Sequence, residues 1–83
     1  MTNEQLERVR NYALDIAEDH LTQTFLGRAT ECLDARDASK RITQSAFDHC
    51  GIAQTPEMYA EVYAEVYALI SIRMAYWDLR GIY

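Results

Sequence analysis

The chain has 83 residues and carries 13 Asp and Glu against 8 Lys and Arg, which gives a formal net charge of −5. This acidity opposes direct attachment to nucleic-acid phosphates and favours docking on a basic surface. Hydrophobic residues make up 49% of the chain, with three Gly and one Pro, so we expect one folded helical domain over residues 1–83 and not disorder.

A first amphipathic helix is predicted from about residue 3 to Leu26. Thr2 or Asn3 can cap its start, and apolar residues then recur at helical spacing until Gly27, which can end it. The start of the chain is polar and acidic and lacks the basic and apolar regions of a signal peptide, so we expect no leader.

The middle of the chain predicts a short helix followed by a longer one. Residues 28–36 have apolar positions three or four apart, which favours the short helix. Asp37 or Ser39 can cap the longer helix, and Gly51 is a good left-handed terminus for it. Cys32 and Cys50 form no CxxC motif, which fits a reduced, cytoplasmic setting.

The last helix has the clearest boundaries in the sequence. Thr55 accepts an unpaired amide, Pro56 presets φ, and Glu57 suits the positive end of the helix dipole. The helix should run from Pro56 to about Arg80. Since no stretch alternates as strands do, the sequence predicts an all-α bundle of three long helices plus one short helix, with a long C-terminal helix.

This last helix repeats Tyr-Ala-Glu-Val every four residues. Tyr, Val and Ile positions share one broad face, and alanines line a second face. Successive tyrosines are a costly way to fill a core, because each buried hydroxyl needs a partner, so we expect an interaction face. The predicted partner-binding residues are the aromatic anchors Tyr59, Tyr63, Tyr67, Tyr76 and Trp77 and the acidic residues Glu57, Glu61 and Glu65.

These features favour a small acidic adaptor or inhibitor over an enzyme. Its expected partner is a larger protein with a basic surface, such as a nucleic-acid-handling protein, in the manner of small regulators from phage or mobile elements. No catalytic residue, metal ligand or cofactor is predicted, and neither direct nucleic-acid binding nor a membrane span is expected. A structural homodimer without a further partner is one alternative, because two-fold pairing would bring Tyr-rich faces together.

A second alternative comes from pairs of acidic residues. Glu4-x-x-Glu7 and Glu31-x-x-Asp34 would each place two carboxylates on one helical face. This pattern resembles the carboxylate motifs of all-α nucleotide pyrophosphohydrolases of the MazG type, and the resemblance implies Mg²⁺-dependent hydrolysis of nucleotides at these four residues. The resemblance covers only these positions, and Ala35-Arg36-Asp37 stand where that family has an apolar run.

Overall fold

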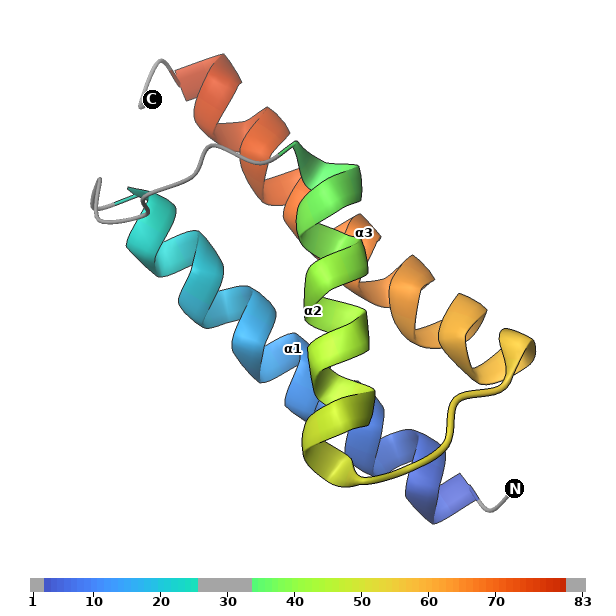
Figure 1. Ribbon diagram of the computed structural model, residues 1–83. Helices are drawn as coiled ribbons and strands as arrows, with labels where there is room; N and C mark the ends of the chain where they lie inside the picture. Colours follow the sequence, from blue (N-terminus) through green and yellow to red (C-terminus); the bar gives the residue numbers. More distant parts are fainter. Residues whose placement is uncertain (1–2, 26–33, 81–83) are drawn as a thin grey trace.

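Three helices form an up-down-up bundle in the computed structural model, which describes residues 3–25 and 34–80 apart from the side chains of Phe25 and residues 77–80. They are α1 (Asn3–Phe25), α2 (Ala35–Cys50) and α3 (Pro56–Arg80). The first and last run side by side in the same direction, and α2 returns obliquely across them (Figure 1). The all-α class predicted from the sequence is confirmed.

The predicted division into three long helices and one short one is wrong for the described residues, because these contain three helices. Most of the expected short helix, residues 28–33, lies outside the description. Its last residues belong to α2, which begins two residues before the predicted Asp37 cap. Asp34 is the N-cap instead, and its carboxylate accepts a hydrogen bond from the Asp37 amide at 2.8 Å. Ser39 is fully buried inside the helix, where its hydroxyl donates to the Ala35 carbonyl at 2.6 Å.

The predicted ends around the second loop are confirmed. Gly51 adopts φ 66° and ψ 28° at the end of α2, a left-handed conformation that glycine reaches without a Cβ clash. Thr55 caps α3, since its hydroxyl accepts a hydrogen bond from the Met58 amide at 3.2 Å and its carbonyl accepts one from the Tyr59 amide at 2.9 Å. Residues 51–55 therefore connect two capped helices.

Residues four apart build the core on every helix. A step of four residues turns about 40° around a helix, so each row of buried residues winds across its helix and two such rows interlock when the helices cross obliquely, at roughly −50°. Small residues in the rows let the helix axes approach closely. The buried rows are Val9, Ala13, Ala17 and Leu21 of α1; Ala38, Ile42 and Ala46, with Ser39, Thr43 and Phe47, of α2; and Met58, Val62, Val66 and Ile70 of α3.

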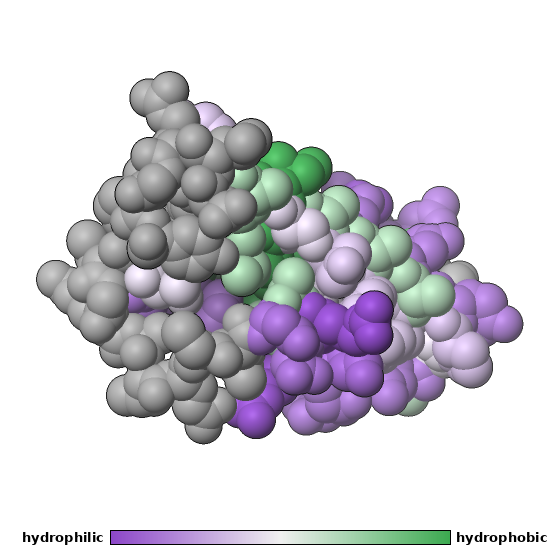
Figure 2. Space-filling model, turned by 90° about the horizontal axis from the view of Figure 1, so that it is seen from above, coloured by the Kyte–Doolittle hydropathy of each residue, from purple (hydrophilic) through white to green (hydrophobic). Residues whose placement is uncertain are grey.

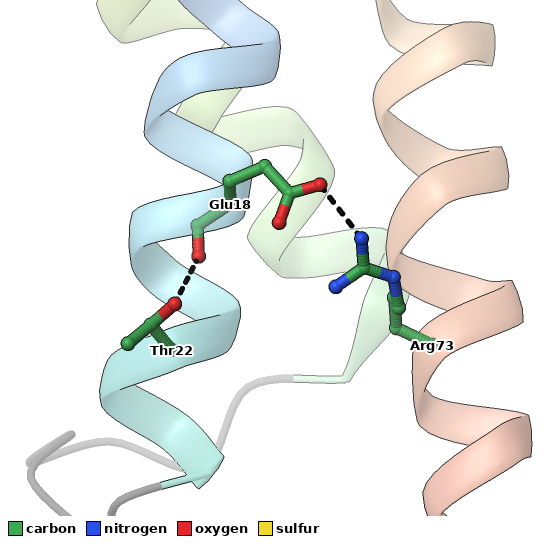
Figure 3. A network of polar contacts seen from close by, with 3 residues as sticks. All are labelled: Glu18, Thr22 and Arg73. Atoms are coloured by element: carbon green, nitrogen blue, oxygen red, sulfur yellow. Dashed lines mark hydrogen bonds and ion pairs between the residues drawn. The ribbon is translucent and has the colours of Figure 1, made fainter.

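Two ion pairs hold α1 beside α3. Arg10 lies 3.5 Å from the Glu65 carboxylate, and the Arg73 guanidinium donates to the Glu18 carboxylate at 2.9 Å. The second pair appears in Figure 3, where Thr22 also donates its hydroxyl to the Glu18 carbonyl. The pairs are eight residues apart on both helices, so α1 and α3 are parallel and in register. Because all four side chains are partly exposed, each pair contributes about 0.2–1 kcal/mol.

Candidate protein-interaction surface

Each position of the Tyr-Ala-Glu-Val repeat has its own place on α3. Val62 and Val66 are fully buried against α1 and α2. From Val62 the next three positions turn outward by about 100° each, so the alanine points away from the bundle and the tyrosine and glutamate lie to either side of it. The outer face of α3 therefore consists of an alanine row flanked by a tyrosine row and a glutamate row. The alanines Ala60, Ala64 and Ala68 and the glutamates Glu57, Glu61 and Glu65 are exposed.

The tyrosine row is a ladder of nearly parallel rings that starts in the core. Phe47 of α2 lies against Tyr59, with ring centroids 6.5 Å apart and planes 17° apart. The ladder continues from Tyr59 to Tyr63 at 6.0 Å and from Tyr63 to Tyr67 at 5.9 Å. Tyr59 and Tyr63 are half-buried, whereas Tyr67 is 38% exposed. Stacking on Tyr63 thus holds the Tyr67 ring in place and leaves part of that ring exposed.

Burial also affects the chemistry of the ladder at its inner end. It raises the pKa of the Tyr59 hydroxyl above the ordinary value of 10.0, and the neighbouring Tyr63 adds to the rise. Both causes disfavour the phenolate. The Tyr59 ring therefore remains a neutral hydrogen-bonding group at physiological pH. A shallow open hollow of about 440 Å³ lies next to it, lined by Gln54, Thr55, Pro56 and Tyr59.

The glutamate row is the acidic edge of the same face. Glu65 is held near Arg10 of α1, as described above. Glu57 and Glu61 are exposed and make no ion pair with any residue in the described part of the chain. These two carboxylates are therefore free to attract a cation. Tyr59, Tyr63 and Tyr67 therefore lie on one flank of the alanine row and the glutamates on the other, as the four-residue period of the repeat requires.

Tyr76, the fourth predicted aromatic anchor, does not extend the tyrosine row. Tyr76 is 52% exposed, but nine residues turn about 180° around a helix, so it lies on the side of α3 opposite Tyr67. Trp77 belongs to α3, and its side chain lies outside the description. Of the five aromatic anchors, the structure brings together Tyr59, Tyr63 and Tyr67.

Exposed apolar surface continues beyond the alanines. Ile72 follows Ala68 by four residues in the same row and is 68% exposed, the largest value among the large hydrophobic residues that the structure describes. Figure 2 shows hydrophobic residues, drawn green, reaching the surface in a band with hydrophilic residues, drawn purple, beside it. The sequence pattern identified the alanine face but left open whether it packs inside the bundle or faces outward, and the structure leaves it exposed.

The acidic pairs of the hydrolase alternative are not brought together in the described structure. Glu4 and Glu7 lie exposed in the first turns of α1, whereas Asp34 caps α2 at the other end of the bundle (Figure 1). Glu31 lies outside the described residues. Among residues 3–25 and 34–80, no three His, Cys, Asp or Glu side chains cluster closely enough to hold a metal ion.

Comparisons with protein-family models, curated proteins and solved structures give no match to this chain. No helix in the described part is both long enough and apolar enough to span a bilayer. The surface of α3 is therefore interpreted from its own residues.

Proposed function

We propose that this protein is a small interaction module, an adaptor or inhibitor, that binds a basic surface of a larger protein through the outer face of α3. The observation that carries the proposal is the pairing of an anchored, partly exposed aromatic row with free carboxylates on the outer face of α3, which no described residue covers. Aromatic residues are enriched at the centre of protein interfaces, and complementary charge speeds and orients association. The proposed setting is the cytoplasm.

Charge and aromatic contacts have separate roles in this proposal. Glu57 and Glu61 accelerate encounter with a basic partner, and their effect is screened by salt. Tyr67 sets the lifetime of the complex, because its exposed edge is covered by the partner while the ladder beneath keeps the ring in place. A basic groove that handles nucleic acid is the partner surface that we favour, since an acidic chain can compete for it.

The test is affinity capture from the native host, followed by binding kinetics with the protein that is captured. Tyr67→Ala should abolish capture and raise the dissociation rate about tenfold or more, while Gln44→Ala, at an exposed position of α2, serves as the control. Combined Glu57→Gln and Glu61→Gln should lower the association rate and its salt dependence. Equal capture by the wild type and Tyr67→Ala would refute the proposed function.

The homodimer alternative uses the same face and is separated from this proposal by the mass of the purified chain. Sedimentation equilibrium of the wild type and of Tyr67→Ala gives that mass directly. A dimer that Tyr67→Ala converts to a monomer, with no protein captured from the host, supports the purely structural role.

A further inference from the structure

The exposed row of α3 has the composition of the rows that the bundle buries. Ala60, Ala64, Ala68 and Ile72 follow each other at four-residue steps on the outside. The corresponding buried row of α1 ends in Ala13, Ala17 and Leu21, each 0–2% exposed. In both rows small residues are followed by one large aliphatic residue. The inner row is packed against other helices, whereas no described residue covers the outer one.

We propose that the occupant of this face is a single basic α-helix of the partner, which crosses α3 along the row from Ala60 to Ile72. This inference rests on the proposed function and deepens it by naming the partner's structural class. A row of alanine methyl groups lets a second helix axis approach to about 8 Å, the short end of the usual range. The three alanines span about 12 Å along the axis, the length of two helical turns.

The flanks of the row define the chemistry of the occupant. On one side Glu57 and Glu61 lie free and four residues apart, so lysine or arginine side chains at a four-residue spacing on the incoming helix can pair with both. On the other side Tyr63 and Tyr67 offer ring edges to aliphatic or aromatic side chains. The occupant is therefore an amphipathic helix with a narrow small-residue row between a basic edge and an apolar edge.

A second copy of the chain fits this face less well. It would bring another net charge of −5, and an antiparallel two-fold pairing of α3 helices would place glutamate row against glutamate row. A basic helix from a different protein meets the free carboxylates with opposite charge. Charge complementarity thus selects a heterologous partner over self-association.

The test uses a synthetic helical peptide of about 20 residues, long enough to be helical in water, with an alanine row, a lysine edge and a leucine edge. A second peptide replaces every lysine with glutamate. Binding to the full chain is measured by fluorescence anisotropy at low and high salt. We expect saturable micromolar binding of the lysine peptide, a loss of affinity at high salt, and no binding of the glutamate peptide.

Two pairs of variants locate the binding on the row. Ala64→Gln should weaken peptide binding about tenfold or more, because the longer side chain blocks close approach, whereas Ala53→Gln makes the same change at an exposed alanine outside α3 and should leave binding unchanged. Combined Glu57→Gln and Glu61→Gln should weaken binding to a similar extent. Asp15→Asn with Asp19→Asn removes two exposed carboxylates of α1 and is the charge-matched control.

The outcomes separate this inference from the proposed function. Failure of the lysine peptide to bind, equal binding of both peptides, unchanged binding of Ala64→Gln, or a dimer of the wild type that Ala64→Gln dissociates would each overturn the basic-helix proposal. Host capture with Ala64→Gln completes the design. If capture depends on Tyr67 but tolerates Ala64→Gln, the protein interaction stands and the helical mode fails; if capture ignores Tyr67, the function itself fails.

Discussion

Replacement of Thr43 by valine should stabilise the protein. Thr43 is fully buried in the row of α2 that carries Phe47, and its hydroxyl oxygen has no hydrogen-bond partner among the described residues. A buried hydroxyl without a partner costs about 1–3 kcal/mol of folding free energy. Valine has nearly the same shape, so Thr43→Val removes this cost without opening a cavity.

We expect a gain of about 1–2 kcal/mol in the free energy of unfolding. For a domain of this size each kcal/mol corresponds to a shift of roughly 4–8 °C in the melting temperature. The gain is a large fraction of the total, because an 83-residue domain has a stability of only about 4–12 kcal/mol.

The measurement is urea unfolding followed by far-ultraviolet circular dichroism. The midpoint of Thr43→Val should rise while the slope m stays constant, which marks a change of stability and not of compactness. Ser39→Ala is the matched control, because Ser39 is equally buried in the same row but its hydroxyl donates to the Ala35 carbonyl at 2.6 Å. That variant should lose stability or remain neutral. A midpoint for Thr43→Val at or below the wild-type value would show that the threonine hydroxyl is satisfied and would refute the reasoning.

Three further predictions address the ends and contacts of the helices. Gly51→Ala should lower the free energy of unfolding, measured in urea, by about 1–2 kcal/mol, and the cause is the positive φ alone, since an added Cβ meets nothing within 4 Å. Gly51→Asn should cost less, because asparagine tolerates the left-handed conformation, and equal losses for both variants would point to another cause. The rings of Tyr12 and His49 stack at 4.1 Å and 5° between α1 and α2, so a double-mutant cycle with Tyr12→Leu and His49→Ala should give a coupling of about 0.5–1.5 kcal/mol, against zero for independent residues. Because burial raises the pKa of Tyr59, the unfolded state loses the hydroxyl proton at a lower pH than the folded state does, so the contribution of Tyr59 to stability is full below pH 10.0 and falls above it. Tyr59→Phe should therefore remove one late-titrating phenol from the ultraviolet titration and reduce the loss of stability at alkaline pH. An unchanged titration curve would contradict this.

Helix ends were predictable where neighbouring residues alone determine them. Thr55 and Gly51 act on amides and carbonyls within a few residues, so their roles are readable without tertiary information. The start of α2 was mispredicted because Asp34, Asp37 and Ser39 are all good caps. The choice among them depended on burying Ala38 and Ser39 against the other helices, which a local pattern does not contain.

The candidate site was predictable in part. The sequence indicated that α3 carries tyrosines suited to half-exposed positions, and Tyr59, Tyr63 and Tyr67 do occupy half-buried or exposed positions. It did not show that Phe47 supports the ladder, since that residue lies in another helix. It also grouped Tyr76 with the other anchors, although that ring lies on a different side of α3. The role of Tyr59, Tyr63 and Tyr67 in binding a partner remains a prediction.

The sequence by itself determined the all-α class, the start of α3 and the four-residue period that places each position of the repeat in a separate row on the helix surface. Only the tertiary structure decided which row is buried. Valine, tyrosine and alanine rows can each pack against a helix, so the periodicity of α3 does not determine which of its rows faces the other helices. The oblique crossing of α2 over α1 and α3 covers Val62 and Val66 and leaves the alanines exposed. That choice depends on how three winding rows interlock, and interlocking is a property of the assembled helices.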